Sequence, residues 1–344
     1  MKGDVGQRQQ GDAAPRVGGG AARLRRRAAC WLLAGALGAA IALPATPAAS
    51  AEALLSPFPI ERDDHSRIDY YLERRAPSAR GGTLLVVLQG SDCNSVRQVE
   101  AIRRDLAGVL PDADLLTIEK YGITAALPYS ADPDRPDCPA AHVEHDTPMR
   151  RARDAAAVVA RLAAENGYAK VVAIGGSEGG VVANLLTARS TLVDATIAFG
   201  GGGRWFLDDV LHSIAVSDLP AAQRAQAVGG MRALARSIAD GEPVPAMSGH
   251  GVAWWRTVFG TDQLAVLREV RTPVLLIQGA EDEAASTAAA RRLAVALARA
   301  GRDNVRLVVY PGLDHRLRGP DGVSQMARVA ADMTTWLRER GFAD

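Results

Sequence analysis

The sequence is poor in cysteine, histidine and aromatic side chains. Its 344 residues include three cysteines and six histidines, and only 5% are phenylalanine, tryptophan or tyrosine. No stretch has the H-E-x-x-H or C-x-x-C pattern of a metal site, and no loop combines paired carboxylates with a histidine. No glycine-rich loop has the spacing of a phosphate-binding motif. We therefore expect neither a metal ion nor another cofactor.

A long apolar run is also missing. The apolar stretch 31–43 has about 13 residues, whereas a transmembrane helix needs roughly 20. Arginines at 23–27 precede this stretch and small residues follow it, which is typical of a secretory signal peptide. We predict that residues 1–51 are such a peptide and are removed, so that the protein is exported, periplasmic or secreted, with no stable membrane anchor.

The details of this leader narrow the prediction. Cys30 precedes the apolar stretch, unlike the cysteine of a lipoprotein lipobox. A buried N-terminal helix is the alternative to a signal peptide, and the choice between Sec and twin-arginine export stays open. Cleavage would remove seven of the 40 basic and two of the 39 acidic residues, leaving 33 and 37 and a net charge of about −4. Such a chain has no basic footprint for nucleic acid.

Two cysteines, Cys93 and Cys138, remain after the predicted cleavage. An even pair in an exported chain, with both residues in loop-like sequence, favours a disulfide over the alternative of two buried free thiols. The bond would close a loop of about 46 residues and would stabilise the protein by roughly 4 kcal/mol.

From residue 67 onward, apolar runs typical of strands alternate with amphipathic segments typical of helices. This alternation predicts a mostly parallel, twisted sheet with helices on both faces. Residues 201–271 interrupt it with helical patterns and no strand, so we expect a helical cap inserted between two strands. The expected strands are 67–75, 83–90, 114–119, 171–174, 194–201, 272–279 and 305–312, and the expected helices are 95–110, 147–165, 179–189, 285–300 and 323–340.

The stretch Gly175-Gly176-Ser177-Glu178-Gly179 has the pattern G-x-S-x-G. It lies between a predicted strand and a predicted helix, which is the setting of a nucleophile elbow. The glycines have a physical task there, because a strand that turns sharply into a helix leaves no room for Cβ atoms beside the serine. A serine hydroxyl is a weak nucleophile at neutral pH, so this hypothesis requires a base and a group that orients it.

His315 is the best candidate for the base, because it follows the last predicted strand and would lie at the same sheet edge as Ser177. Asp282, which follows the strand at 272–279, is the expected orienting acid, and Glu281 is the alternative. The order serine, acid, histidine along the chain is also the order found in enzymes whose serine stands on a nucleophile elbow. The other histidines are expected at the surface, with His250 as a candidate substrate contact beside Trp254 and Trp255; they are His65, His142, His145, His212 and His250.

These motifs resemble those of the α/β-hydrolase superfamily, and most nearly its dienelactone hydrolase and prolyl-oligopeptidase-like branch. The matching stretches are 175–180, 273–282 and 310–315, and the resemblance covers roughly residues 67–341. It implies an α/β-hydrolase domain over residues 52–344 with its cap at about 201–271. It also implies that Ser177 is the nucleophile, His315 the general base and acid, and Asp282 the residue that orients the histidine.

In this superfamily two backbone N–H groups bind the oxyanion. One would be the N–H of Glu178, just after the nucleophile. The other usually follows an H-G-x motif, but here Gln89 replaces the histidine, and the N–H of Ser91 is the expected donor with Asp92 as the alternative. A disulfide at Cys93 would brace this loop.

The resulting prediction is an exported serine hydrolase that cleaves an ester, thioester or amide through an acyl-enzyme. Carboxylic ester hydrolysis is favoured, with a peptidase or acyltransferase as alternatives. A catalytically silent binding protein on the same fold is the alternative from another class. Small-molecule esters or short peptide-like molecules are the expected substrates. An apolar wall over the site, or alternatively the core of the cap, would be formed by Trp205, Trp254 and Trp255. The sequence does not indicate an oligomeric state.

Overall fold

The computed structural model describes residues 57–75, 81–132 and 134–342. The chain divides into two units, 1–50 and 51–344, and the fold below is that of the second. The predicted signal peptide lies outside the described residues. Within them, an eight-stranded sheet has the order β1-β2-β4-β3-β5-β6-β7-β8. The strands are Phe58–Glu61 (β1), Arg67–Glu73 (β2), Thr83–Leu88 (β3), Asp114–Ile118 (β4), Lys170–Gly176 (β5), Ala195–Phe199 (β6), Val274–Gly279 (β7) and Val305–Tyr310 (β8).

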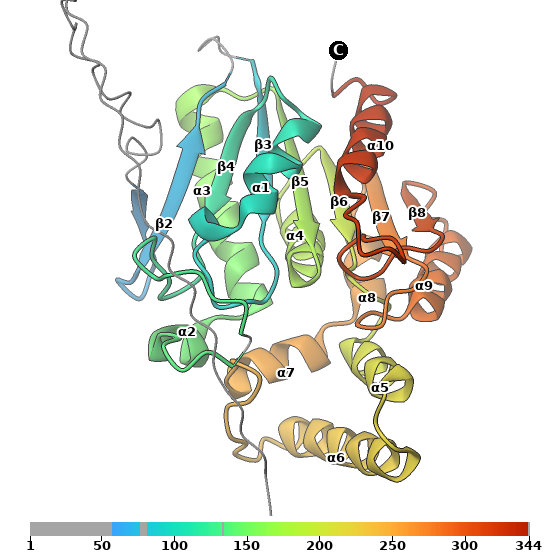
Figure 1. Cartoon of the computed structure of the whole chain (residues 1–344). Coiled ribbons are helices and arrows are strands. Elements are labelled where there is room, and N and C mark those ends of the chain that lie inside the picture. Colours follow the sequence, from blue (N-terminus) through green and yellow to red (C-terminus); the bar gives the residue numbers. More distant parts are fainter. Residues whose placement is uncertain (1–56, 76–80, 133, 343–344) are drawn as a thin grey trace, which may run out of the picture. The chain divides into compact units, whose positions relative to one another are not determined.

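Strand β2 runs antiparallel to both of its neighbours, and the other pairings are parallel. The prediction of a mostly parallel sheet with helices on both faces is thus confirmed (Figure 1). The helices are Glu100–Arg104 (α1), Ala140–His145 (α2), Pro148–Asn166 (α3), Glu178–Arg189 (α4), Phe206–Val216 (α5), Ala221–Ala239 (α6), Val252–Gly260 (α7), Gln263–Glu269 (α8), Thr287–Arg299 (α9) and Met326–Arg338 (α10). Among the described helices, none combines the length and the apolar character that crossing a membrane requires.

The sheet separates two apolar layers because successive side chains of a strand point to opposite faces. Along β3, Leu85 and Val87 belong to the cluster that contains Met333 of α10, whereas Leu84 and Val86 belong to the cluster that contains Val158 of α3. All four β3 side chains are essentially inaccessible to solvent. This burial on both faces explains why the strand reads as a continuous apolar run.

The predicted helix at 95–110 is wrong as a single element. The segment forms a 3₁₀ turn at Val96–Gln98, the short helix α1 and a second 3₁₀ turn at Leu106–Val109. Glu119, at the end of β4, accepts hydrogen bonds from the hydroxyl of Ser95 (2.5 Å) and the N–H of Val96 (3.0 Å). Val99 then adopts an extended conformation (φ −86°, ψ 92°), which interrupts the helix. The apolar residues of this segment do have helical spacing, but hydrogen bonds to the buried carboxylate of Glu119 fix the position of its first residues.

Four helices lie between β6 and β7, where the sequence predicts a cap at 201–271. Helices α5, α6 and α7 contact one another around a cluster that includes Ile238, Trp254 and Trp255. In Figure 1 they gather beyond one end of the sheet, in the yellow to orange part of the chain. Helix α8 instead packs against α4 and α9, and its Leu267 joins the cluster beside β7. The insertion therefore leaves the sheet at α5 and returns to it at α8.

Candidate active site

Ser177 stands at a sharp turn between β5 and α4. Its backbone has φ 54° and ψ −127°, a strained combination for a residue with a side chain. A Cβ atom on Gly175 would lie 2.0 Å from the carbonyl oxygen of Gly179, and one on Gly179 would lie 2.2 Å from that of Leu88. Both glycines are therefore required by the close approach of strand and helix, and the turn has the geometry that the sequence pattern predicts for a nucleophile elbow.

The structure brings Ser177, His315 and Asp282 into one hydrogen-bonded chain. The Nε2 of His315 lies 3.2 Å from the Oγ of Ser177, and its Nδ1 lies 2.8 Å from the Oδ2 of Asp282. Each residue follows the carboxyl end of a parallel strand, β5, β8 or β7, and these ends meet at one edge of the sheet. In this arrangement the imidazole can take a proton from the hydroxyl while the carboxylate orients it.

Asp282 is held from several directions. Its side chain is inaccessible to solvent, and its Oδ1 accepts hydrogen bonds from the N–H groups of Ala284 (2.8 Å) and Ala285 (2.7 Å). Its Oδ2 accepts one from the Nε2 of Gln278 (2.5 Å) as well as facing His315. These donors fix the orientation of the carboxylate. Glu281, the alternative acid, is exposed.

The two residues expected to supply the oxyanion donors, Ser91 and Glu178, line one cavity together with Ser177. Glu178 is the first residue of α4, so its N–H is at the positive end of the helix dipole. Ser91 lines the same cavity as Ser177 and Glu178, whereas the alternative, Asp92, does not. A Cβ atom on Gly90 would lie 3.8 Å from the Cβ of Ser177, which shows how closely this loop approaches the elbow.

Arg151, which sequence reasoning missed, links the elbow to this loop. It lies in the first turns of α3, which begins where the Thr147 hydroxyl accepts the N–H of Arg150. The Arg151 side chain is only 6% exposed and donates to the carboxylate of Glu178 and to the backbone carbonyl of Gln89. It also lies 3.4 Å from the carbonyl of Gly90. The one available signal was a basic residue on the buried face of an amphipathic helix.

The cap makes a hydrogen bond to the same carboxylate. The indole Nε1 of Trp254, in α7, donates to the Oε2 of Glu178 at 2.5 Å. Glu178 therefore contacts the cap through one oxygen and Arg151 through the other. Glu178 is thus hydrogen-bonded directly to α3 and α7, and it is linked through Arg151 to the loop at 89–91.

Gln89, which replaces the histidine of the H-G-x motif, stabilises the loop through its own amide. Its Nε2 donates to the Oδ1 of Asp92 (2.7 Å) and to the carbonyl of Asn94 (3.1 Å). Lys120 donates to the carbonyl of Asp92 from a fully buried position, and this burial lowers the pKa of its ammonium group. The loop therefore has side-chain support, although of a different kind from that in the family motif.

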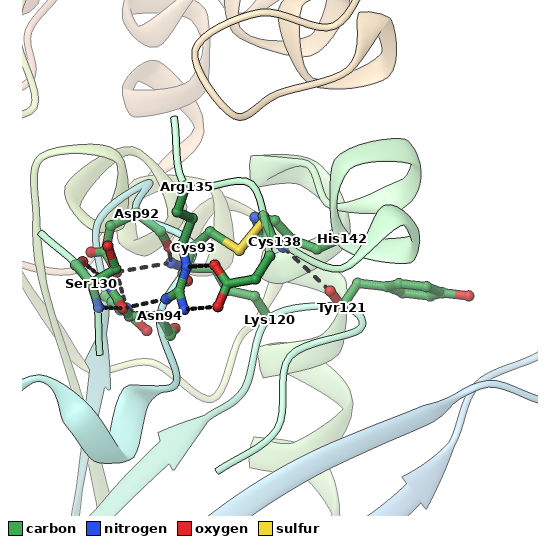
Figure 2. Close-up of a disulfide and its surroundings, with 11 residues drawn as sticks. Asp92, Cys93, Asn94, Lys120, Tyr121, Ser130, Arg135, Cys138 and His142 are labelled. Carbon is green, nitrogen blue, oxygen red and sulfur yellow. Dashed lines mark hydrogen bonds and ion pairs between the residues drawn. A yellow bond between two sulfur atoms is a disulfide. The ribbon is translucent and has the colours of Figure 1, made fainter. Parts of the chain in front are cut away.

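A disulfide joins Cys93 and Cys138, with their Cα atoms 6.0 Å apart (Figure 2). Arg135 donates to the carbonyl of Cys93 (2.9 Å) and to the Oδ1 of Asn94 (2.9 Å) on the same loop. Cys93, Cys138 and His142 form the one group of possible metal-ligating atoms found among the described residues. Because both sulfurs are oxidised, they offer no thiolate for a metal ion. The disulfide fastens the segment that follows Ser91.

A cavity of about 450 Å³ opens above Ser177 and His315. Much of its wall is apolar, from Val181, Val210, Ile214, Met231 and Val258. Asp209, also in the wall, accepts hydrogen bonds from the N–H groups of Gly203 (3.1 Å) and Ser286 (2.8 Å), and burial raises its pKa to about 6. The cavity has the size and character of a small-molecule site.

The predicted aromatic wall is divided between two cavities. A second cavity, of about 280 Å³, shares Ser91, Phe206 and Trp254 with the first and is also lined by Trp255. Trp254 and Trp255 are at the same time part of the cap core. Trp205 lines neither cavity and lies instead under the guanidinium of Arg204, 5.0 Å from its ring.

The other histidines do not reach Ser177. His65 and His145 are exposed, and the ring of His212 donates to the backbone carbonyl of Asp282 (3.1 Å). His142 is buried beside the disulfide, so the expectation of a surface position is wrong for it. The same expectation is wrong for His250, which is also buried. It lines the second cavity and is stacked on Trp254 with ring centroids 3.9 Å apart.

Comparison with solved structures shows that this chain has the α/β-hydrolase fold. A cold-adapted esterase from an Arctic intertidal metagenomic library matches with a TM-score of 0.52 and 17% identity, over 83% of this chain and 92% of that one. Est1E from Butyrivibrio proteoclasticus, in complex with ferulic acid, matches with a TM-score of 0.56 and 16% identity, over 82% and 98%. A puromycin-hydrolyzing peptidase of Mycobacterium tuberculosis matches with a TM-score of 0.57 and 16% identity, over 84% of this chain.

The family model that matches is that of the Prolyl oligopeptidase family, over residues 235–340. This range contains Asp282 and His315 but not Ser177. The chain spans 39% of the length of the puromycin-hydrolyzing peptidase, so it corresponds to one part of that protein. No curated protein matches the chain. The predicted resemblance to the α/β-hydrolase superfamily and its prolyl-oligopeptidase-like branch is confirmed by the fold and by this family model.

Proposed function

We propose that the protein is a serine hydrolase that cleaves a carboxylic ester through an acyl-enzyme intermediate. The observation that carries the proposal is the continuous chain of hydrogen bonds from Ser177 through His315 to the buried Asp282, at the floor of a largely apolar cavity. The esterases among the similar structures support it further.

In the proposed reaction, the Nε2 of His315 takes the proton of Ser177 as its Oγ attacks the carbonyl carbon. The negative charge that forms on the carbonyl oxygen is bound by the N–H groups of Ser91 and Glu178. Each such donor contributes about 3 to 4 kcal/mol to transition-state stabilisation in related chemistry. His315 then donates the proton to the leaving group, and a water molecule releases the acyl group by the reverse sequence of proton transfers.

Amide hydrolysis is the second candidate, because the family model that matches is a peptidase family. The same residues would serve both reactions, and only the leaving group differs. We also propose that the protein acts outside the reducing cytoplasm, since the Cys93–Cys138 disulfide requires an oxidising compartment to persist.

The test combines active-site labelling with turnover. A fluorophosphonate should label the wild-type protein and not the Ser177→Ala variant, and chromogenic esters of short and long acyl chains should be hydrolysed only by the wild type. Aminoacyl anilides in the same panel separate esterase from peptidase. Ester turnover that survives Ser177→Ala would remove this serine from its role, and a properly folded wild type without label would favour a silent binding protein.

A further inference from the structure

The second cavity, hereafter the side cavity, adjoins the proposed reaction centre without containing it. Ser91, Phe206 and Trp254 line both spaces, whereas Ser177 and His315 line only the main cavity. A substrate whose carbonyl oxygen meets the N–H of Ser91 therefore has one end beside the opening of the side cavity. No step of the proposed reaction uses this space of about 280 Å³.

Two side chains in the wall of the side cavity can accept hydrogen bonds, in addition to the hydroxyl groups of Ser91 and Ser248. Asp92 contributes a carboxylate whose side chain is 44% exposed. The ring of His250 is 91% buried, lines the cavity, and forms no side-chain hydrogen bond among the described residues. Its ring nitrogens are not among the fully buried polar atoms that lack a partner, so a ligand or water in the cavity can reach them.

The one charged side chain that lines the cavity is Asp92, whose carboxylate lies 3.9 Å from the ammonium group of the buried Lys120. Although burial opposes ionisation of Asp92, the charge of Lys120 and two side-chain hydrogen bonds hold the pKa of its carboxyl below the usual range. Burial lowers the pKa of His250 to about 4, so its ring is neutral at pH 7 and can accept a hydrogen bond. Lys120 and Arg151 are 1% and 6% exposed and line neither cavity, so neither cation meets a ligand there.

Aromatic rings form much of the remaining wall. Phe206, Trp254 and Trp255 line the side cavity together with the acceptors. Rings of this kind attract cations over their free faces, and one face of Trp254 is covered by His250. A carboxylate beside the rings adds charge-assisted hydrogen bonds. Acceptors, aromatic faces and the absence of a lining cation together favour one ligand chemistry, that of an organic ammonium group.

We propose that the side cavity binds a primary ammonium group on the acyl part of the substrate, between Asp92, His250 and the aromatic wall. This inference rests on the proposed function. The leaving group must lie where His315 can protonate it, which places it in the main cavity. The part that extends past Ser91 is then the one that stays on Ser177, namely the acyl part. The substrate class is thus narrowed to esters or amides of amino-substituted acids.

The test uses p-nitroanilides of amino acids whose amine lies two to six carbons from the carbonyl. Each is paired with the anilide of the same carbon skeleton without the amine. For at least one chain length, wild-type kcat/KM should favour the amine-bearing member about tenfold or more, the size of a charge-assisted contact. Asp92→Asn keeps an acceptor for Gln89 and should reduce the preference below about threefold. Because this change also removes the ion-pair partner of Lys120, the ratio of kcat/KM within each pair is compared, not the absolute rate of the variant. His250→Phe keeps the stacking on Trp254 and should weaken the preference in the same direction.

Asp112→Asn, which makes the same chemical change at an exposed loop position, is the control and should leave the preference unchanged. Calorimetric binding of the same pairs to Ser177→Ala removes turnover from the comparison. Tighter binding of the amine-bearing member, lost in Ser177→Ala/Asp92→Asn, supports the site even where hydrolysis is not seen. Equal binding of both members, or a preference that survives Asp92→Asn, overturns it. Hydrolysis that survives Ser177→Ala contradicts only the proposed function.

Discussion

Replacement of Arg151 tests whether this residue positions the loop that carries Ser91. Both side chains of the Arg151–Glu178 pair are 6% exposed, so Arg151→Met leaves a buried carboxylate without its main partner. Breaking a buried ion pair from one side costs about 3 to 5 kcal/mol of stability. The carbonyls of Gln89 and Gly90 also lose their donor, and the loop is no longer held against the elbow. Loss of one oxyanion donor would lower kcat about 100-fold, which corresponds to about 2.7 kcal/mol.

A second variant separates the two effects. In Arg151→Met/Glu178→Gln the buried charge is gone, and the glutamine oxygen can still accept the N–H of Trp254. We expect most of the lost stability to return, as measured by urea unfolding, because no unpaired carboxylate remains. We expect kcat for a chromogenic ester to stay about 100-fold below wild type, because the Gln89 and Gly90 carbonyls still lack a donor.

The matched control is another buried arginine–carboxylate pair, in which Arg62 contacts Asp154 of α3. Arg62 and Asp154 have side chains that are 8% and 7% exposed and lie 2.7 Å apart, on residues that line neither cavity. Arg62→Met should cost similar stability and leave kcat unchanged. Recovery of kcat together with stability in Arg151→Met/Glu178→Gln would refute the reasoning, since Arg151 would then serve only to neutralise Glu178.

Three further results are expected. Because the disulfide fastens the loop after Ser91, Cys93→Ser/Cys138→Ser or mild reduction should lower esterase activity at temperatures where circular dichroism still reports a folded protein; simultaneous loss of both signals would contradict this. Burial raises the pKa of Asp209 from 3.8 to about 6, so its contribution to stability is present below pH 4 and is lost as the pH rises through 6. Over this range, urea unfolding should show the wild type losing about 3 kcal/mol of stability relative to Asp209→Asn. Parallel stability curves for the two proteins would contradict this prediction. Trp254→Phe removes a 2.5 Å hydrogen bond to the buried carboxylate of Glu178 and should lower stability in thermal unfolding by about 1.5 to 3 kcal/mol. Trp255→Phe removes only a 3.4 Å hydrogen bond to the carbonyl of Met247 and should lower stability less. Equal losses of stability in the two variants would count against the role given to Glu178.

The fold could be predicted from local patterns because its buried strands have a strong signature. A continuous apolar run such as 83–88 has one stable environment, the middle of a sheet covered on both faces. The segment 95–110 could not be predicted, because its helical spacing competes with a contact to Glu119 that is distant in sequence. Strand β1 has mostly exposed side chains, so its sequence has no apolar pattern that predicts a strand.

The proximity of Ser177, Asp282 and His315 was predictable for a topological reason. Parallel strands place their carboxyl ends at one edge, so residues that directly follow such strands must meet there. The contacts of Arg151 and Gln278 were not predictable in this way. Arg151 acts from a helix, and its partners come from a loop and from another helix. Gln278 did carry a signal, since a polar residue in a fully buried strand needs a partner, and that partner is Asp282.

The side chain of Glu178 explains why Arg151 and Trp254 make their contacts beside the elbow. The pattern G-x-S-x-G leaves the residue after the serine free, and its N–H serves as an oxyanion donor whatever its side chain. A carboxylate at this buried position needs hydrogen-bond partners in place of water. Arg151 and Trp254 supply them, and Arg151 then reaches the loop whose usual histidine is replaced by Gln89. The carboxylate of Glu178 and the backbone carbonyl of Gln89 are therefore connected through Arg151.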